Sequence, residues 1–228
     1  MVDLSRNDLR TQAYVLRRTN FGEADRILNL ITSEGKVSAI ARGVRKEKSK
    51  LAGGIEMFSL IDINVHYGKS ELAVVTSAKM LKYYGGILKD FSRMELAGVI
   101  LKKISLAAES SDNPEYFKIV DLCFEALNRG VAICLVESWF WLNLARATGE
   151  EINLYRDNKG EKLVEDLRYS WDGIESALMA DLRGEIDADI IKIMRLMLAT
   201  EIRVVERVKG VEEKCRAILK IARAVNKV

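Results

Sequence analysis

The stretch FSLIDINVHY, residues 58–67, alternates apolar and polar side chains along its length. The two alternating sets are Ile61, Ile63, Val65 and Tyr67, and Asp62, Asn64 and His66. Because successive side chains of a strand point to opposite faces, this pattern predicts a β-strand with one buried face.

Four further short apolar runs surround this strand in the first 82 residues. Together they make five predicted strands, at residues 13–19, 26–32, 36–44, 58–67 and 72–81, separated by turns that contain glycine. An open sheet would leave two exposed edges, and closing it into a barrel removes both. The sequence therefore predicts a small β-barrel. A five-stranded OB-type barrel is the most economical interpretation, and an SH3-like barrel is the alternative.

From residue 83 onward the apolar residues follow a helical period. The predicted helices cover residues 91–109, 114–130, 131–148, 187–208 and 211–227. Pro114 suits the first turn of a helix, and Gly130 suits the position just after a helix end. Residues 149–184 (the insertion) have weak periodicity and are predicted to be irregular. The predicted fold class is α+β, with an OB-fold domain at residues 1–82 and an α-helical domain at residues 83–228.

Composition places the chain among ordinary globular proteins. Apolar residues make up 49% and charged residues 30%. The longest apolar run, residues 131–145, is too short for a membrane span and contains Glu137, and the N-terminus has no apolar segment of the kind that directs export. Cys123, Cys134 and Cys215 are an odd number without CxxC spacing, which indicates reduced cysteines. We therefore expect a cytoplasmic protein that does not enter a membrane.

The motifs that would indicate an enzyme are missing from the sequence. His66 is the single histidine and has no cysteine near it, so a metal site or a histidine-based triad would need partners brought together only by folding. There is no Walker A motif and no GxGxxG motif to hold a nucleotide. We expect no enzymatic activity, no cofactor and no metal.

Positive charge is concentrated in the first part of the chain. Residues 1–85 hold 14 of the 36 basic and 9 of the 33 acidic residues, a net charge of +5, whereas the remaining 22 basic and 24 acidic residues give −2. Residues 42–50 (the basic loop) carry five cations against one acid, Glu47. Such a segment can follow a phosphate backbone, whereas the simpler interpretation of a charge run is a solvated loop.

The strand that leads into the basic loop extends this predicted cationic surface. Lys36 and Arg42 share one face of that strand, because side chains alternate. Arg17 and Arg18 on the first strand point to opposite faces, so at most one of them joins the surface. The predicted DNA contacts are Lys36, Arg42, Arg45, Lys46, Lys48, Lys50, Arg17, Tyr67 and Lys69.

Aromatic side chains of OB barrels stack on nucleic-acid bases. The aromatic residues available in the predicted strands and turns are Tyr14, Phe21, Phe58 and Tyr67. Tyr14 and Phe58 are expected in the core. Tyr67, at a strand end beside the turn GKS, is the candidate for stacking.

Four motifs between residues 14 and 69 carry a resemblance to a known family. They are YVL, the GEADRI turn, the T.EGKVSAIARG segment and the R...S.L.GG...FSL pattern that follows. Together they resemble the N-terminal OB domain of the RecO family of bacterial recombination mediators. The likeness becomes a shared outline in LAVVTSAK and is thin over the helical half, where LNLARATG and DIIKIMRLMLA are the best matches.

The resemblance implies an OB barrel, a helical domain and a role as a recombination mediator in DNA repair. It implies binding of single-stranded and double-stranded DNA, annealing of single strands, cooperation with RecR, and contact with the C-terminal tail of single-strand-binding protein. The resemblance also implies that the mediator helps to load recombinase onto strands coated by single-strand-binding protein, in the cytoplasm at the nucleoid. Many family members hold zinc through four cysteines in the helical domain. Residues 153–173 occupy the corresponding place without a cysteine, so we expect no zinc.

The predicted helix at 187–208 offers a candidate receptor for that tail, which the resemblance implies is acidic and ends in an apolar residue with a free carboxylate. A receptor needs an apolar slot and a cation, preferably the fork of an arginine. On a regular helix Arg195 would flank Leu198 and Ile202, with Arg203 beside them. The alternative is that Leu198 and Ile202 are core and Arg195 only shields their edge.

Two other classes of function remain open from the residues alone. An RNA- or ribosome-binding OB protein would share the cationic surface but not the family motifs. A protein-interaction adaptor would have a basic loop that is only solvated.

Overall fold

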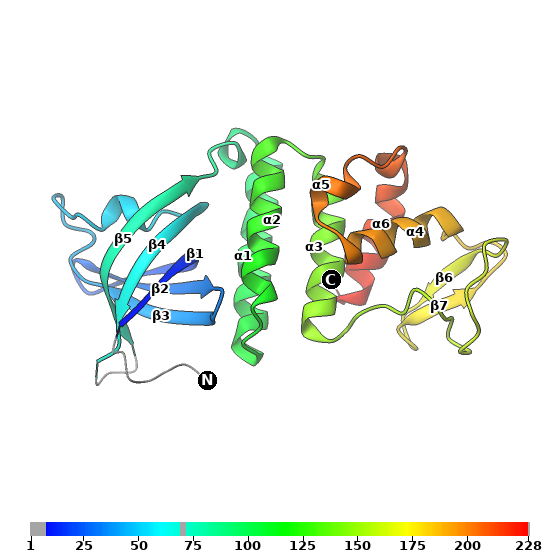
Figure 1. The fold of residues 1–228 in the computed structure, drawn as a ribbon, viewed down its shortest axis with the longest axis horizontal. Coiled ribbons are helices and arrows are strands. Elements are labelled where there is room, and N and C mark those ends of the chain that lie inside the picture. The colour runs from blue at the N-terminus through cyan, green and yellow to red at the C-terminus, as the bar shows by residue number, and fades with distance from the viewer. Residues whose placement is uncertain (1–7, 69–71, 228) are drawn as a thin grey trace. The chain divides into compact units, whose positions relative to one another are not determined.

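The chain folds into two compact units that divide between Asn128 and Arg129. The computed structural model describes residues 8–68 and 72–227, and Figure 1 labels their helices and strands. Within these residues, no helix combines the length and the apolar character needed to cross a membrane.

Five strands of the first unit form a closed barrel. They are β1 (Asp8–Phe21), β2 (Asp25–Thr32), β3 (Gly35–Ala41), β4 (Ser59–His66) and β5 (Ala73–Tyr83). Their order around the barrel is β1-β2-β3-β5-β4, and the pairing of β1 with β4 closes the ring. All neighbouring pairs are antiparallel except β3 and β5, which run parallel. The predicted five-stranded OB-type barrel is confirmed, as is the α+β fold class.

The alternation of apolar side chains sets the register of the barrel. In β4, Ile61, Ile63 and Val65 are buried in the barrel core, whereas Asp62 and Asn64 are only partly buried on the outer face. In β1, β2 and β3, alternate residues likewise contribute buried side chains to the barrel core. A shift of one residue would expose the apolar set of a strand, so the pattern specifies one pairing.

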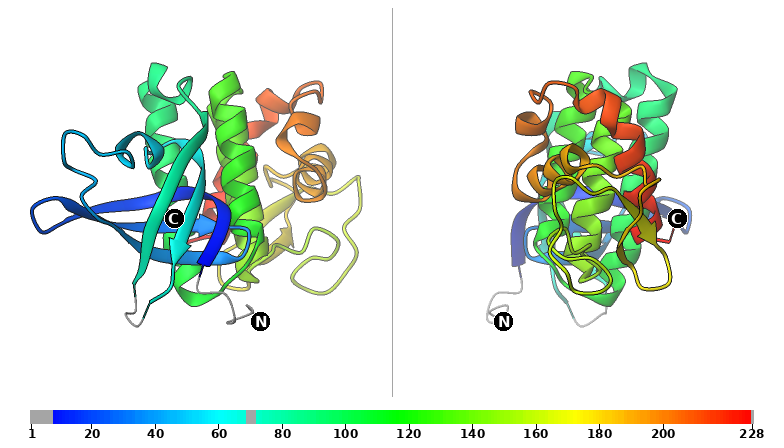
Figure 2. Two further views of the ribbon diagram at one scale, coloured as in Figure 1. Left: turned by 60° about the vertical axis from the view of Figure 1, so that its left-hand side comes forward. Right: turned by 90° about the vertical axis from the view of Figure 1, so that its right-hand side faces the viewer.

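Two helices complete the first unit. A short 3₁₀ turn, η1 (Ala52–Gly54), lies in the connection between β3 and β4, and another, η2 (Ile87–Lys89), precedes α1 (Phe91–Ser110) and α2 (Glu115–Arg129). Helix α1 packs against β1, β2 and β3, and Figure 2 shows both helices beside the barrel. The compact unit therefore extends well beyond residue 82, where the predicted OB-fold domain ends, because both helices bury apolar faces on the outside of the barrel.

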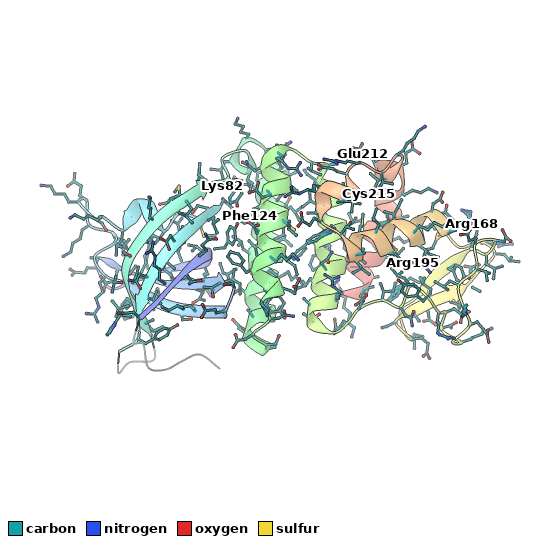
Figure 3. All side chains as sticks on the ribbon, viewed as in Figure 1. Lys82, Phe124, Arg168, Arg195, Glu212 and Cys215 are labelled. Atoms are coloured by element: carbon teal, nitrogen blue, oxygen red, sulfur yellow. The ribbon has the colours of Figure 1, made fainter. Side chains whose placement is uncertain are left out.

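A buried aromatic cluster joins α2 to the barrel. The Tyr14 ring lies 5.5 Å from the ring of Phe124 and 5.3 Å from that of Phe117, and Figure 3 shows Phe124 extending from α2 toward the barrel. The Tyr14 hydroxyl donates to Asp121 Oδ1 at 2.5 Å and lies 2.8 Å from the Tyr84 hydroxyl. Burial first, and then the hydrogen bond to Asp121, raise the pKa of Tyr14. Tyr14 is thus a core residue, as predicted.

The second unit is organised around α3 (Ile133–Thr148), which packs against α4 (Ala188–Ala199), α5 (Ile202–Val205) and α6 (Val211–Val225). Its residues 135–145 are all buried, which agrees with the central position expected from its apolar sequence. Trp141 donates to Glu137, which also accepts from Arg223 of α6 at 2.8 and 2.5 Å. The acidic side chain inside this helix is therefore paired.

The single helix predicted at residues 187–208 is wrong, because the chain leaves the helix at Thr200. Three side chains of α3 bind the carbonyl groups at the end of α4. Trp139 donates to the Thr200 carbonyl at 2.9 Å, and Asn143 donates to that of Met197 at 3.1 Å. Arg146 donates to that of Leu198. With its last carbonyls satisfied from outside, α4 can end there without losing those hydrogen bonds.

The insertion, predicted to be irregular, contains a two-stranded hairpin, β6 (Tyr169–Asp172) and β7 (Ala177–Ala180). Its inner residues Ile152, Leu154, Tyr169 and Leu178 are buried. The Tyr169 backbone exchanges two hydrogen bonds with Ile186, at 2.9 and 3.0 Å. Apolar packing and backbone pairing therefore hold a segment in which the sequence has neither cysteine nor histidine.

Candidate nucleic-acid interface

The basic loop is held against the turn between β1 and β2. The Arg45 N–H donates to the Ala24 carbonyl at 2.9 Å, and the Gly43 N–H donates to Asp25 Oδ1 at 2.7 Å. The Arg45 guanidinium also donates to the Gly22 carbonyl at 3.3 Å. The GEAD turn and the loop that follows β3 therefore form one ordered surface. This contact joins the GEADRI turn to the end of the T.EGKVSAIARG segment.

Four cations of the basic loop are free to meet a ligand. Arg42, Lys46, Lys48 and Lys50 are exposed. Within residues 8–68 and 72–227 their side chains form no ion pair and no hydrogen bond. The opposing carboxylate of Glu47 is exposed as well. The loop presents a dense positive field to solvent, which is the property that attracts a polyanion.

The outer face of β1, β2 and β3 leads from this loop across the barrel. Arg17 is opposite Asn29 on β2, which is opposite Ser38 on β3. Directly opposite residues of antiparallel strands share a face, so these three polar side chains form a row. Arg17 is exposed, whereas Arg18 points to the other side and pairs with Glu56 at 2.9 Å. Of the two neighbouring arginines, Arg17 is the one on the candidate surface.

Lys36 occupies the predicted face but is neutralised there. Its ammonium group lies 3.1 Å from Glu109 of α1, and its side chain is largely buried. The helix that covers this part of the barrel supplies the carboxylate, which could not be inferred from a pattern within the strand. The cationic face expected along the whole of β3 is therefore reduced to its end, at the basic loop.

The two predicted contacts beyond β4 have different outcomes. The Tyr67 ring is 41% exposed, and partial burial together with the carboxylate of Glu34 raises the pKa of its hydroxyl. Base stacking by Tyr67 stays a prediction, and the nearby carboxylate would not favour a phosphate. Lys69 lies outside the described residues.

Phe21 is absent from the predicted contacts, yet it is an exposed aromatic residue of this surface. It ends β1, directly before the turn that the basic loop contacts, and 52% of its surface is accessible. The sequence carries one signal for it, an aromatic residue placed immediately before a glycine turn. That signal alone does not distinguish an exposed ring from a core ring.

The predicted partner site on the helical half is only partly assembled. Arg195 and Leu198 of α4 line one open cavity of about 540 Å³. The Arg195 guanidinium donates to the Leu154 carbonyl at 2.5 and 3.1 Å and lies 4.5 Å from the centre of the Tyr155 ring. Figure 3 labels Arg195 on its helix.

The other two predicted members of that site are placed differently, because the helix ends between them and Leu198. Ile202 is 1% exposed and belongs to the core, as the alternative interpretation of the sequence has it. Arg203 is exposed and pairs with Glu201 at 3.0 Å. The continuous arrangement of Arg195, Leu198 and Ile202 expected on a regular helix is therefore wrong.

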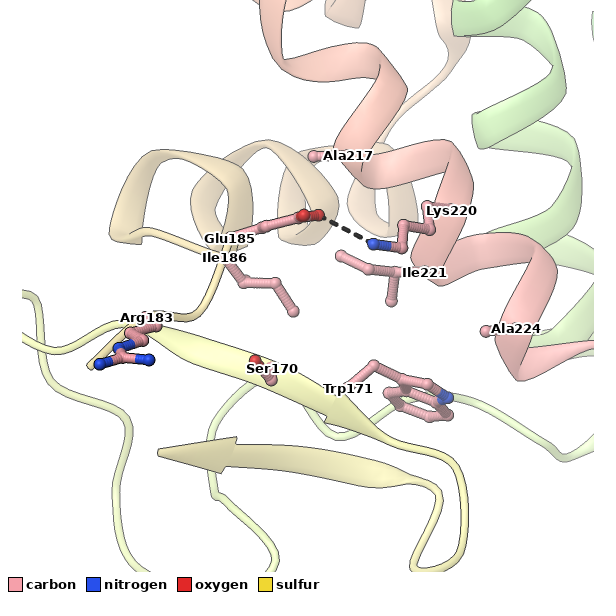
Figure 4. Close-up of a pocket in the computed structure, with 9 residues that line it drawn as sticks. All are labelled: Ser170, Trp171, Arg183, Glu185, Ile186, Ala217, Lys220, Ile221 and Ala224. Atoms are coloured by element: carbon pink, nitrogen blue, oxygen red, sulfur yellow. Dashed lines mark hydrogen bonds and ion pairs between the residues drawn. The ribbon is translucent and has the colours of Figure 1, made fainter. Parts of the chain in front are cut away.

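A second cavity, of about 360 Å³, lies between the hairpin and α6. Figure 4 shows Trp171 and Ile221 at its apolar side and the Glu185–Lys220 ion pair, 3.0 Å long, at its edge. None of the residues selected from the sequence lines it. Glu185 and Lys220 are paired with each other, and we assign this cavity no ligand.

The metal-binding potential of the described residues is low. Within them, no group of three or more histidine, cysteine, aspartate or glutamate side chains could hold a metal ion. The insertion has no thiol or imidazole in its sequence, so it does not fit the four-cysteine zinc site that the family resemblance implies. That the protein binds no zinc stays a prediction.

Two of the three cysteines influence each other's ionisation. The Cys134 thiol, at the start of α3, accepts a hydrogen bond from Cys215 that lowers its pKa to about 7. The same contact raises the pKa of Cys215, and burial raises that of Cys123. The Ser138 hydroxyl lies 3.6 Å from Cys215 Sγ. Cys134 is therefore the most nucleophilic thiol of the three.

The comparisons with known proteins point to one family. The family model described as "Recombination protein O N terminal" matches residues 6–84. A protein named "DNA repair protein RecO" from Roseiflexus sp. (strain RS-1) is 34% identical over 147 residues, which cover 64% of this chain and 52% of the relative. A protein of the same name from Dehalococcoides mccartyi (strain ATCC BAA-2266 / KCTC 15142 / 195) is 26% identical over 211 residues, covering 89% and 83%.

A third relative of that name, from Rubrobacter xylanophilus (strain DSM 9941 / JCM 11954 / NBRC 16129 / PRD-1), is 30% identical over 142 residues, covering 61% of this chain and 57% of the relative. The chain thus spans about half the length of the Roseiflexus and Rubrobacter relatives that it matches. The Dehalococcoides match extends over most of both chains.

A closed barrel in the order β1-β2-β3-β5-β4, with a cationic loop held against its first turn, defines an OB-fold protein. The matched residues 6–84 coincide with this barrel and with the motifs noted in the sequence. Residues 6–84 are therefore similar to the N-terminal domain of the RecO family.

Proposed function

We propose that this protein acts in DNA repair and recombination by binding single-stranded DNA on its OB barrel. The observation that carries the proposal is the basic loop, in which four exposed cations without partners are held against the turn between β1 and β2. The name shared by its relatives, "DNA repair protein RecO", supports the choice of DNA as the ligand.

The charge of the loop accounts for how annealing could follow from binding. Two complementary strands repel each other through their phosphates, and a cationic surface that contacts both lowers this repulsion. No chemical bond changes in that process, so we propose a mediator that is not an enzyme. As a mediator it would also bind double-stranded DNA, the product of annealing, and would act in the cytoplasm at the nucleoid.

The proposed partners come from the family resemblance. We propose that the protein cooperates with RecR and with single-strand-binding protein to load recombinase onto coated strands. The cavity beside Arg195 and Leu198 is a candidate receptor for the acidic tail of single-strand-binding protein, because it combines an arginine with apolar walls. Glu151 also lines this cavity and would oppose an acidic peptide, so the receptor depends on Arg195 and Arg146.

Tail binding can be tested with a matched pair of arginine variants. Arg195→Ala should weaken the binding of a fluorescent tail peptide at least fivefold, whereas Arg203→Ala, which removes an exposed arginine outside the cavity, should not. Fluorescence anisotropy measures both affinities, and thermal melting confirms that each variant is folded. Equal affinity for both variants and the wild type would place the tail elsewhere.

DNA binding is tested by direct competition between nucleic acids. Wild-type protein should bind a labelled single-stranded oligonucleotide in a gel shift at moderate salt, and unlabelled single-stranded DNA should compete better than structured RNA. Preference for structured RNA would favour an RNA- or ribosome-binding OB protein. Absence of any shift would favour an adaptor whose basic loop is only solvated.

A further inference from the structure

We infer that Phe21 is a base-stacking residue of the DNA site, placed beside the phosphate-binding cations by the contact between the β1–β2 turn and the basic loop. The inference rests on the proposed function and adds a second kind of contact to it. Cations bind the phosphates of any strand, whereas an aromatic ring binds the face of a base.

The position of Phe21 in β1 directs its ring to the same face as Arg17. Both residues, together with Thr19, are separated by steps of two along a continuous strand, so their side chains point to one side. Four residue steps along the strand place Arg17 and Phe21 roughly 13 Å apart. A strand of DNA that meets Arg17 on the outer face of the barrel can therefore continue to Phe21 and the basic loop.

The backbone beneath Phe21 is held at several points. Phe21 is opposite Asp25 in the register of the hairpin, and Asp25 accepts the Gly43 N–H at 2.7 Å. The next residue, Gly22, accepts a hydrogen bond from the Arg45 guanidinium at 3.3 Å. A ring on a held backbone loses little conformational freedom when a base stacks on it, which favours binding.

Phe21 differs from Phe58 and Phe124 in its exposure and in its lack of a ring partner within the part of the chain that the structure describes. The rings of Phe58 and Phe124 pack against each other at an interplanar angle of 57°, with centroids 5.9 Å apart. Phe21 is 52% exposed, and no aromatic ring of the described residues packs against it. Single exposed apolar residues are common on protein surfaces, so we infer the site from the combination of an exposed ring, a held turn and four cations in the loop that this turn contacts.

The two kinds of contact respond differently to salt. Phosphate contacts release counterions, so their contribution falls as salt rises, whereas stacking on an uncharged ring has no such dependence. Phe21→Ala should therefore weaken binding of single-stranded DNA by roughly 5- to 150-fold at every salt concentration. The slope of log affinity against log salt should remain that of the wild type.

The experiment compares four variants on two ligands. Phe21→Ala and Phe21→Leu should both lose affinity, and Phe21→Trp should keep it and show fluorescence quenching when DNA binds. Phe91→Ala is the matched control, because Phe91 is 76% exposed on α1 and lies outside this surface. On an oligonucleotide of abasic sites, which offers phosphates but no bases, wild type and Phe21→Ala should bind equally.

Three results would overturn the inference. Phe21→Ala could bind DNA like the wild type, Phe21→Leu could keep full affinity, or the loss could persist unchanged on the abasic strand. Failure of the proposed function looks different, because the wild type would then bind neither oligonucleotide. Thermal melting of each variant separates loss of a contact from loss of the fold.

Discussion

Removal of the free charges of the basic loop should flatten the salt dependence of DNA binding by a predictable amount. The change is the substitution of Arg42, Lys46, Lys48 and Lys50 by glutamine (the loop variant). Arg45 is left in place, because its guanidinium holds the Gly22 carbonyl and its loss would disturb the turn as well as the charge. The four substituted side chains have no partner among the described residues, so their removal should leave the fold intact.

The magnitude follows from the number of contacts. Each phosphate contact with single-stranded DNA contributes about 0.7 to the slope of log affinity against log salt, so four contacts contribute about 2.8. Between 50 and 200 mM salt, a fourfold change, the wild type should therefore lose about 50-fold more affinity than the loop variant. If only some of the four cations contact phosphates, the slope falls in proportion; two contacts would contribute about 1.4, which corresponds to about 7-fold over the same salt range.

Fluorescence anisotropy of a labelled oligonucleotide at four or five salt concentrations measures both slopes. The control variant substitutes glutamine for Lys89, Lys102, Lys118 and Lys209, which are exposed and lie outside the basic loop. It removes the same total charge, so it corrects for the general field of the protein. Our reasoning is refuted if the loop variant keeps the wild-type slope, or if the control variant flattens it equally.

Three further outcomes are expected. Tyr14→Phe removes the hydroxyl group that donates a hydrogen bond to Asp121. This variant should have a free energy of unfolding in urea that is lower by about 1–3 kcal/mol. Burial raises the pKa of Tyr14, so the folded protein holds the proton of the Tyr14 hydroxyl more tightly than the unfolded chain does. The stability of the wild type should therefore fall above about pH 10, and the stability of Tyr14→Phe should fall less. The rate at which iodoacetamide alkylates Cys134 should rise with pH with a midpoint near 7, and this midpoint should shift upward in Cys215→Ala. Cys123 should stay unreacted until the protein unfolds. Mass spectrometry of peptides measures the reaction of each thiol, and equal reaction of all three would contradict this prediction. Purified protein should contain no stoichiometric zinc, and a chelator should leave its melting temperature unchanged; one zinc per chain by elemental analysis would show the opposite.

The barrel could be predicted from the sequence because its information is local. Alternation along 58–67 separates a core face from an outer face, and the buried Ile61, Ile63 and Val65 follow that pattern. Turns containing glycine mark the ends of strands. With five such strands, closure is the arrangement that satisfies every edge, so the fold class required no knowledge of distant contacts.

The helical half was predictable in its elements and not in its details. Periodicity located α1, α2, α3, α6 and the start of α4, but the end of α4 depends on hydrogen bonds from Trp139, Asn143 and Arg146, which lie more than fifty residues earlier. Nothing in the local sequence around Thr200 reports those donors. The predicted partner site failed at the same point, because it assumed a helix that continues to Ile202.

The candidate DNA surface divides in the same way. The concentration of charge in residues 42–50 can be read from the amino acids alone, because a loop with five cations and one acid is cationic in any fold. Which of these charges are free, and which residues lie beside them, depends on how the chain folds. The fold pairs Lys36 with Glu109 of α1, and it brings the turn that follows Phe21 against the basic loop through Asp25 and Arg45. Charge is a property of composition, whereas its neutralisation and its neighbours depend on contacts between segments far apart in the chain.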